Sequence, residues 1–268
     1  MSQQEKSKRF VALHERTGAF IIPNPWDGGS ARLLQGLGFE ALATSSSACA
    51  ANYGRRDGAV SRVEALAHAR AIVEATELPV AGDLEKGFGD SPEDAAATIR
   101  EAASIGLVGG SIEDATGDPD QPLHEFDLAV ARIAAARRAI DDSGTAVVLT
   151  GRSEGFVVGR PDIDETVRRL QAYAEAGADC LYAPRLDQVA HVEAIVSAVA
   201  PLPVNLLINA PFITVAEAAD LGVRRISVGG TLARTAWGGW LAAARELAES
   251  GTVTAFDDLP NVDALLGR

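Results

Sequence analysis

The amino-acid sequence predicts an α/β protein in which eight parallel strands alternate with helices in one (β/α)8 barrel. The first observation is a repeated pattern, in which an Ala-rich segment of helical period ends in Gly and a short apolar run follows. Gly ends a helix in the left-handed conformation, and such a run is typical of a buried parallel strand. The second observation is that eight expected strands alternate with helices within 268 residues, without a long linker. A doubly wound open sheet is the alternative, and it is disfavoured because no G-x-G-x-x-G follows the first strand.

Each expected strand has its own local signal. Composition indicates the first and fifth strands, Pro introduces the third and seventh, and a helix-ending Gly precedes the other four. In chain order, the strands are expected at 20–22, 39–43, 79–83, 107–114, 146–150, 178–181, 203–208 and 223–226. Ala-rich segments between strands are expected to form helices at 63–76, 94–104, 128–140, 163–176 and 192–199. We also expect a single domain over 1–268, with an N-terminal helix within 1–18 and a helical extension from about 254 to 268.

Composition excludes several classes of partner. The net charge of −13 argues against nucleic acid and anionic membranes. Apolar residues make up 47% of the chain, which is enough for a substantial core. Cys49 and Cys180 provide neither a disulfide framework nor a metal-ligand spacing. The first residues are polar and no long apolar run follows, so we expect neither a signal peptide nor a transmembrane helix, and a cytoplasmic protein.

Two carboxylates mark the end of the third strand. Asp83 and Glu85 are separated by one residue and followed by a Gly-rich turn. Alternation along a strand would place them on one face, where they repel each other unless a positive charge lies between them. Hard oxygen ligands of this kind suit Mg²⁺ or Mn²⁺. Two solvated acids at a strand end are the alternative interpretation.

Polar residues also follow the other predicted strands. The carboxyl ends of all eight strands meet at one end of a barrel, which is where barrel enzymes carry their active sites. Acids, an arginine and hydroxyl groups at this end would suit a divalent metal and an anionic substrate. Besides the carboxylate pair, the residues expected there are Ser45, Ser46, Ser47, Asp57, Glu113, Arg152, Arg185, Asn205 and Asn209.

Five sequence motifs connect these positions: N-P-W-D-x-x-S-A-R at 24–32, G-x-x-D at 54–57, D-x-E-x-G-F-G at 83–89, I-E-D at 112–114 and G-R-x-E at 151–154. With the serine turn, they resemble the isocitrate lyase/phosphoenolpyruvate mutase superfamily over roughly 20–230. The resemblance implies a TIM barrel. It also implies an enzyme that cleaves or rearranges a C–C or C–P bond next to a 2-oxo or 2-hydroxy acid, through a Mg²⁺-bound enolate.

The resemblance further implies a role for each acid. Asp83 resembles the direct ligand of Mg²⁺, with Mn²⁺ as the alternative ion. Glu85 and Glu113 resemble the groups that hold waters of that metal, and Asp57 belongs to the same outer shell. Retained waters agree with the reluctance of Mg²⁺ to lose its hydration.

The resemblance also assigns the substrate-binding groups. Ser45, with the backbone N–H groups of Ser46 and Ser47, resembles a cradle for the substrate carboxylate. Arg152 resembles the arginine that binds the same end, where its charge stabilises a developing enolate. From their strand-end positions, we also expect Arg185, Asn205 and Asn209 near the distal end of the substrate, with capping of a helix as the alternative for one of them.

The segment 115–125 departs from the superfamily. Isocitrate and methylisocitrate lyases carry K-K-C-G-H there, with the Cys as general acid, and mutases carry Lys and Asn. Here the segment contains neither Cys nor Lys, so His124 is its only acid/base candidate, and an idle loop histidine is the alternative. Lys86 replaces a small residue of the superfamily; it either neutralises the acids or points to solvent, and solvent is favoured.

Three function classes follow from these residues. The first is a Mg²⁺-dependent lyase or hydrolase of a small 2-oxo acid, with an oxaloacetate decarboxylase as the leading example. A phosphoenolpyruvate mutase or phosphonopyruvate hydrolase is the alternative within the superfamily. The second class is another barrel enzyme; a Schiff-base aldolase is nearly excluded because Lys86 is the only lysine outside the N-terminus. The third is a 2-oxo-acid-binding relative with little turnover. The resemblance also implies a homo-oligomer, a dimer or tetramer, in which the helix within 257–266 is exchanged between subunits.

Overall fold

The protein forms the predicted (β/α)8 barrel. The computed structural model describes residues 1–257 and 259–266. All seven strand pairings are parallel, in the order β1-β8-β7-β6-β5-β4-β3-β2. The ring closes between β1 and β2 by a backbone hydrogen bond from Ala43 to Pro23, 3.1 Å. The strands are β1 Phe20–Ile22, β2 Leu42–Ala43, β3 Val80–Asp83, β4 Gly109–Glu113, β5 Val148–Arg152, β6 Cys180–Tyr182, β7 Val204–Leu207 and β8 Arg225–Ser227.

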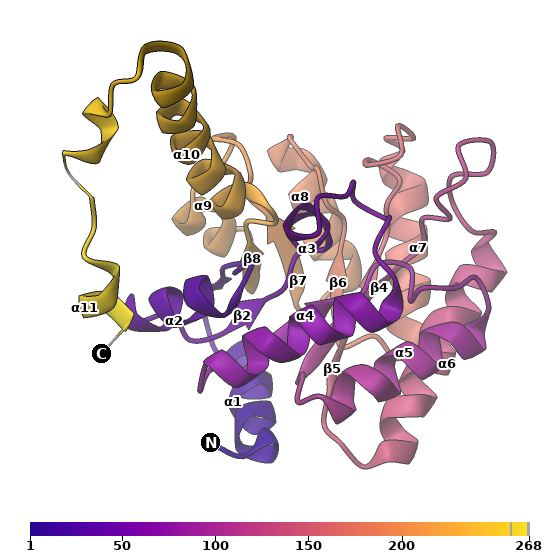
Figure 1. Ribbon diagram of the computed structural model, residues 1–268. Coiled ribbons are helices and arrows are strands. Elements are labelled where there is room, and N and C mark those ends of the chain that lie inside the picture. The colour runs from indigo at the N-terminus through magenta and orange to yellow at the C-terminus, as the bar shows by residue number, and fades with distance from the viewer. Residues whose placement is uncertain (258, 267–268) are drawn as a thin grey trace.

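Helices surround the sheet and follow the strands in the expected alternation (Figure 1). Four of them, α2, α3, α9 and α10, lie outside the helix ranges expected from the sequence, and α3 begins in the serine turn itself. The helices are α1 Gln3–Glu15, α2 Gly28–Gly36, α3 Ser46–Asn52, α4 Arg62–Ala75, α5 Pro92–Ser104, α6 Phe126–Ser143, α7 Ile163–Glu175, α8 Val189–Val199, α9 Val215–Asp220, α10 Thr231–Ser250 and α11 Val262–Leu266, with a 3-10 turn at Thr254–Phe256.

Local sequence sets several helix starts. The hydroxyl groups of Ser61, Ser91 and Thr214 accept hydrogen bonds from the first turns of α4, α5 and α9. An acidic side chain three residues later bonds back to each capping residue, which completes a capping box. Such a cap stabilises a helix by about 1 kcal/mol, so these starts are encoded within four residues.

The apolar core has two parts. The larger part lies between the sheet and the outer helices, and the smaller part fills the lower half of the barrel. Helix α1 closes the barrel from below in Figure 1 and inserts Phe10, which is fully buried. A side chain at Gly109 would meet the Phe10 ring, because a Cβ atom there would lie 2.7 Å from it. Apolar side chains therefore fill the lower half of the barrel interior.

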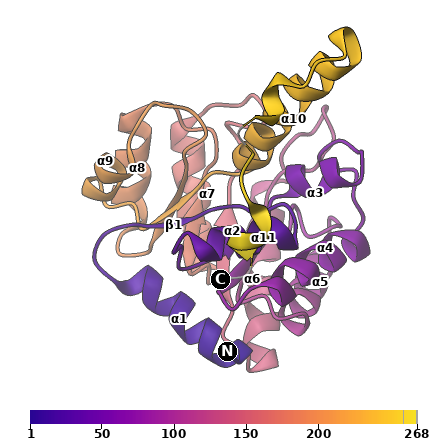
Figure 2. The same cartoon turned by 60° about the vertical axis from the view of Figure 1, so that its left-hand side comes forward.

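The C-terminal part of the chain leaves the barrel. Helix α10 projects outward, and the segment after it returns so that α11 lies beside α2 (Figures 1 and 2). Arg32 on α2 donates a hydrogen bond of 3.0 Å to the carbonyl of Leu266. The expected extension at 254–268 is thus a 3-10 turn and α11 in the described residues, while 258, 267 and 268 lie outside them.

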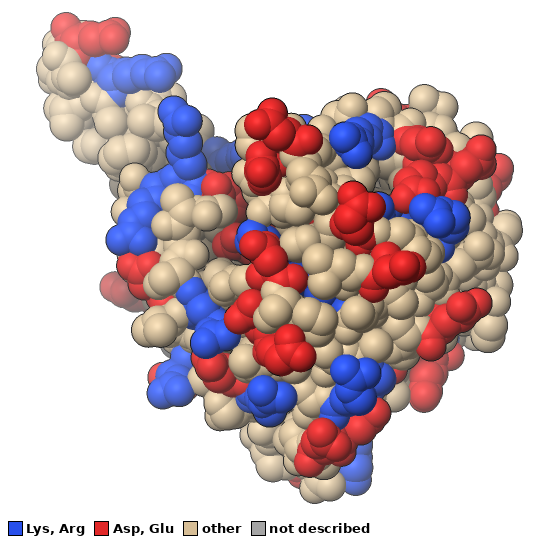
Figure 3. Space-filling model, turned by 90° about the vertical axis from the view of Figure 1, so that its right-hand side faces the viewer, with Lys and Arg blue, Asp and Glu red and all other residues tan. Residues whose placement is uncertain are grey.

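The outer surface carries mixed charge. On the face shown in Figure 3, acidic and basic side chains are interspersed. Over residues 1–257 and 259–266, no helix combines the length and the apolar character that crossing a membrane requires.

Candidate active site

Two adjoining cavities open at the carboxyl ends of the strands. The inner cavity, about 60 Å³, lies inside the barrel, and its lining includes Thr150, Asn205, Arg225 and Ser227. The outer cavity, about 160 Å³, lies above it, and its lining includes Ser45, Ser46, Ser47, Asp57, Arg185, Asn209 and Arg234. Both cavities are lined by Asp83, Arg152, Tyr182 and Gly229. The predicted site residues from β2, β3, β5 and β7 are thus brought to one place.

Arg152 is the centre of the site. Its Nη1 lies 3.2 Å from Asp83 Oδ1 and 3.1 Å from Glu113 Oε2, and its Nε lies 2.5 Å from Glu154 Oε1. Burial alone would lower the pKa of Arg152, but Glu113, Glu154 and Asp83 outweigh burial and hold that pKa well above its ordinary value. Arg152 is therefore a permanent cation held among three carboxylates.

A second acid network fixes Glu154. The backbone N–H of Glu154 donates to Asp114 Oδ1 at 2.7 Å. The other oxygen of Asp114 accepts from Tyr173 Oη at 2.7 Å and from Arg169 Nη1 at 3.3 Å. The sequence places Glu154 in the G-R-x-E motif without a role, and the structure makes it a direct partner of Arg152.

The remaining acids carry more negative charge than the local cations offset. Burial, followed by the charges of Asp83 and Asp57, raises the pKa of Glu85 to about 7. Burial and the charge of Asp83 also raise the pKa of Asp57. Burial raises the pKa of Glu113 well above its usual range, and Arg152 counters only part of this rise. These carboxylates resist ionisation in the absence of a further positive charge.

The donor set fits a hard divalent cation. Its members are carboxylate oxygens, which Mg²⁺ prefers, and their charge is incompletely paired. In the described part of the chain, no three carboxylate, imidazole or thiol groups are gathered closely enough to enclose a metal ion by themselves. Mg²⁺ commonly binds through one or two carboxylates and several waters, and Asp83 is the acid that lines both cavities.

Glu85 does not continue the strand as its spacing predicts. Strand β3 ends at Asp83, and Glu85 lies in a turn with a φ of 49°, closed by a hydrogen bond of 2.8 Å from Gly87 N to Leu84 O. A left-handed backbone is unfavourable for a residue with a Cβ atom. The backbone N–H of Glu113 bonds to the Glu85 carbonyl at 3.1 Å, which ties this turn to β4.

The serine turn has a more specific arrangement than predicted. Ser45 caps α3, its hydroxyl accepting from Ala48 N at 3.4 Å and lying 3.1 Å from the hydroxyl of Ser47. The backbone N–H of Ser46, expected to hold the substrate carboxylate, donates to Asp83 Oδ2 at 3.0 Å instead. The turn therefore positions Asp83 in this structure.

The two asparagines have different surroundings. Asn209 lines the outer cavity, whereas Asn205 is buried below it and bonded on both sides, to Arg225 and Ser227. Sequence reasoning missed Tyr182 and Arg234, which also line the site. Tyr182 directly follows the strand predicted at 178–181 and is the last residue of β6, so its strand-end position was the available signal. Arg234 lies on α10, and only the tertiary structure brings it over the site.

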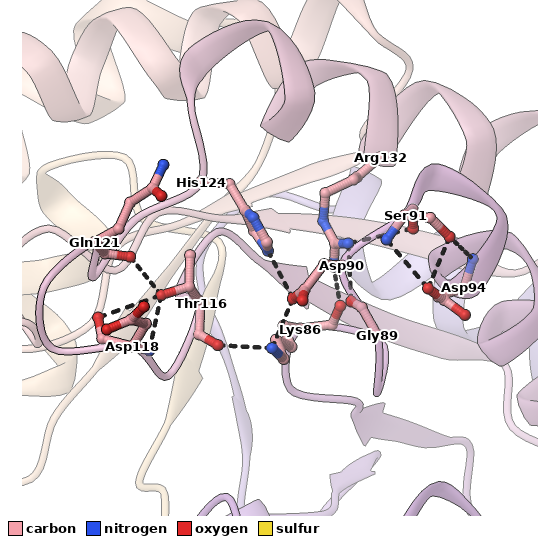
Figure 4. A network of polar contacts seen from close by, with 10 residues as sticks. All are labelled: Lys86, Gly89, Asp90, Ser91, Asp94, Thr116, Asp118, Gln121, His124 and Arg132. Atoms are coloured by element: carbon pink, nitrogen blue, oxygen red, sulfur yellow. Dashed lines mark hydrogen bonds and ion pairs between the residues drawn. The ribbon is translucent and has the colours of Figure 1, made fainter.

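The segment after Asp114 is a hairpin. Hydrogen bonds hold it against the loop that follows β3, as Figure 4 shows. Ala115 and Leu123 form an antiparallel bridge. Lys86 Nζ donates to the carbonyl of Thr116 at 2.6 Å and to Asp90 Oδ1 at 2.6 Å. The expectation that Lys86 points to solvent is therefore wrong, since its ammonium joins two loops.

His124 lies behind the site. It is 4% exposed and its Nε2 lies 3.8 Å from Asp90 Oδ1, beside Arg132 (Figure 4). Burial and then the charge of Arg132 lower the pKa of His124 to about 4, so the ring is neutral at pH 7. His124 is not among the residues that line either cavity.

Comparisons with known proteins agree with this geometry. The family described as phosphoenolpyruvate phosphomutase matches residues 10–248. An oxaloacetate decarboxylase from Paraburkholderia xenovorans is 30% identical over 228 residues, 82% of this chain and 73% of that protein. The crystal structure of a candidate lyase/mutase from Burkholderia cenocepacia J2315 is 46% identical, with a TM-score of 0.96 over 99% of this chain and 98% of that one. A phosphonopyruvate hydrolase crystallised with oxalate and Mg²⁺ is 26% identical, with a TM-score of 0.88 over 100% of this chain and 95% of that one.

Proposed function

The chain belongs to the phosphoenolpyruvate phosphomutase family, and on that premise we propose that it cleaves the C3–C4 bond of a small 2-oxo acid, with oxaloacetate decarboxylation as its reaction. The observation that carries the proposal is the position of Arg152, a buried cation at the junction of two cavities and among the acids that suit a divalent metal. The similarity to an oxaloacetate decarboxylase supports the choice of reaction.

Mg²⁺ is the proposed cofactor, with Mn²⁺ as a substitute. Asp83 would hold the ion directly and Glu85 and Glu113 would hold its waters, so that it supplies positive charge to the oxygen of the developing enolate. The raised pKa of Glu85 and that of Glu113 support this assignment, because a bound cation would favour their ionised forms.

Arg152 would bind and then stabilise the reacting acid. Its planar guanidinium suits a carboxylate and keeps its charge at any pH. When the C3–C4 bond of oxaloacetate breaks, CO₂ leaves and the bonding electron pair moves toward the C2 carbonyl oxygen. A fixed cation in a partly enclosed site stabilises that charge more than water would. Ser45 and Ser47 offer hydroxyl donors on the same side of the outer cavity.

One observation favours a second candidate function. Arg185 and Arg234 line the outer cavity, and within the described residues neither forms an ion pair with an acid. The φ of Arg185 is 62°, which is costly for a residue other than Gly and is common at functional sites. Two further cations would suit a phosphonate as well as a second carboxylate. Hydrolysis of phosphonopyruvate is therefore the alternative reaction. Both oxaloacetate and phosphonopyruvate carry at least two negative charges.

Assembly with a second copy is a further part of this proposal. Helix α10 has one buried residue, Ala233, while Trp240, Leu241 and Leu247 are 65%, 42% and 50% exposed. An exposed apolar face of this kind commonly marks a protein–protein contact. We propose that it pairs with another copy of the chain in a homo-oligomer.

A substrate panel tests the proposed reaction. Purified protein would be assayed with oxaloacetate, phosphonopyruvate, isocitrate and methylisocitrate, with Mg²⁺ and with excess chelator. We expect Mg²⁺-dependent turnover of oxaloacetate that is lost in Asp83→Asn and kept in Asp118→Asn, an exposed acid of the hairpin. Full activity in chelator would overturn the metal assignment. A folded protein that binds oxalate but turns over none of the four acids would instead be a binding relative.

A further inference from the structure

A chain of buried polar residues continues from the site into the barrel. Arg225 on β8 is 6% exposed and forms no ion pair with an acid in the described residues. Its Nε donates to Asn205 Oδ1 at 2.9 Å, its Nη2 to Thr150 Oγ1 at 3.0 Å, and its Nη1 lies 3.3 Å from His14 Nε2. Burial, followed by the charge of Arg225, lowers the pKa of His14 to about 3, so this ring is a neutral acceptor. Every partner of this cation is therefore neutral.

The donor and the acceptor of each hydrogen bond in this row of side chains can be assigned. Arginine only donates, so it fixes the Asn205 carbonyl oxygen toward itself and turns the amide nitrogen away. That nitrogen donates to Ser227 Oγ at 3.0 Å. The hydroxyl of Ser227 thereby accepts one hydrogen bond and keeps its own hydrogen for another acceptor. The order of donation runs from Arg225 toward the mouth of the barrel.

Tyr182 lies next to this row of hydrogen-bonded side chains, at the mouth of the barrel. Its Cα pairs with Arg152 on one side and with Asn205 on the other, and Asn205 pairs with Arg225, so these four residues lie side by side on neighbouring strands. Ser227 lines the inner cavity together with Tyr182. Burial raises the pKa of the Tyr182 phenol to about 12, and the charge of Arg152 and then the Ser227 side chain counter only part of this rise. The phenol thus keeps its proton at neutral pH.

The phenol faces the space where the reaction would occur. Tyr182 lines both cavities, and the Arg152 guanidinium carbon lies 5.2 Å from the centre of its ring. Within residues 1–257 and 259–266, the phenol donates to no protein acceptor at hydrogen-bond distance. His124, the acid/base candidate of the segment 115–125, faces Asp90 and lines neither cavity.

We propose that Tyr182 is the general acid that protonates the enolate carbon, and that Ser227, Asn205 and Arg225 position its hydroxyl. The inference rests on the proposed function, because it requires an enolate of a 2-oxo acid. In this step the phenol O–H bond breaks and a C3–H bond forms with the electron pair of the enolate double bond, while the C2 carbonyl is restored. The phenolate then takes a proton from water that enters through the outer cavity. An enolate carbon is more basic than a phenolate, so the transfer is favourable.

Exchange of the pyruvate methyl hydrogens tests the step in isolation. Protein with Mg²⁺ and pyruvate in D₂O would be followed by NMR, since each cycle of enolisation and protonation replaces a hydrogen by deuterium. General acid–base catalysis contributes about 10²- to 10⁴-fold, so Tyr182→Phe should exchange at least about 100-fold more slowly. Because the substitution keeps the ring beside Arg152, affinity for oxalate should change less than about twofold. Ser227→Ala should slow exchange by a smaller factor, about tenfold.

The outcomes separate this inference from the proposed function. If the wild-type protein exchanges pyruvate hydrogens and Tyr182→Phe exchanges them at the same rate, the general acid lies elsewhere and only this inference fails. If the wild-type protein neither exchanges pyruvate nor decarboxylates oxaloacetate, the proposed function fails and this inference fails with it. Slow exchange in Tyr182→Phe together with unchanged oxalate binding supports the proposal, whereas a parallel loss of oxalate binding indicates that Tyr182 only shapes the site.

Discussion

Replacing Arg152 by Ala should destabilise the protein as well as inactivate it. The three carboxylates around Arg152 are themselves little exposed, at 18% for Asp83, 14% for Glu113 and 3% for Glu154. Removing one partner of a buried ion pair costs about 3–5 kcal/mol, because the remaining charge is left without compensation. We expect a loss of about that size in the free energy of unfolding without metal, and a fall in turnover of about 10²- to 10³-fold.

The loss of stability should depend on pH in a defined direction. The folded-state pKa of Glu113 and that of Glu154 are already raised above their ordinary values, and removing Arg152 would raise them further. A raised carboxyl pKa makes the folded state bind more protons than the unfolded state, so its stability is greatest at low pH and falls as pH rises toward the folded-state pKa. Arg152→Ala should therefore be closest to the wild-type protein near pH 5 and furthest from it at pH 8.

Urea denaturation at pH 5 and pH 8, with and without Mg²⁺, measures the free energy of unfolding of the wild-type and Arg152→Ala proteins. Arg168→Ala is the matched control, because Arg168 is 57% exposed and forms an ion pair with Glu165 and a contact with the Phe126 ring at the surface. It should change the free energy of unfolding by less than about 1 kcal/mol. Mg²⁺ at about 100 times its dissociation constant should restore up to about 2.7 kcal/mol. An Arg152→Ala protein as stable as the wild type at pH 8 without metal would refute the view that Arg152 neutralises buried carboxylates.

Three further predictions follow from the same structure. Mg²⁺ affinity, measured by calorimetry, should fall as pH decreases through about 7, because the pKa of Glu85 is about 7 and its protonated form carries no charge to balance the ion. Glu85→Gln should flatten this pH profile with a moderate loss of affinity, and an unchanged profile would contradict the role of Glu85. Truncation before Asp257 removes α11 and its contact with α2 and should weaken assembly in sedimentation, whereas a stable monomer for the intact chain at micromolar concentration would contradict the proposed oligomer. Turnover of isocitrate and methylisocitrate should be at least about 10²-fold below that of oxaloacetate, because the hairpin lacks the thiol acid of those lyases; methylisocitrate turnover at a comparable rate would show that another residue serves those substrates.

Much of the barrel was predictable because its signals are local. A Gly after several helices, a short apolar run and the capping residues Ser61, Ser91 and Thr214 specify elements within a few positions. Strand ends were less certain, since β5 continues to Arg152, two residues past the expected end. Pairing with β4 and β6 extends β5, and that pairing is not visible from the segment alone.

The sequence predicted which residues belong to the site better than it predicted how they contact one another. Strand order alone brings Asp83, Glu113 and Arg152 to one end of the barrel. Which partner each of them contacts depends on side chains from distant segments, as when Ser46 N–H bonds to Asp83. Lys86 was misjudged for the same reason, because its partners Asp90 and Thr116 are set by the packing of two loops.

The contacts of Arg152 also constrain the order of binding. Its Nη1 is shared between Asp83, which is assigned to the cation directly, and Glu113, which is assigned to the waters of that cation. A guanidinium engaged with three carboxylates has few donors left for a fourth. A divalent cation that neutralises Asp83 and Glu113 would weaken those two contacts and make Nη1 available to an incoming acid. Binding of oxalate should therefore be strongly cooperative with Mg²⁺, and by reciprocity oxalate should tighten Mg²⁺ by the same factor.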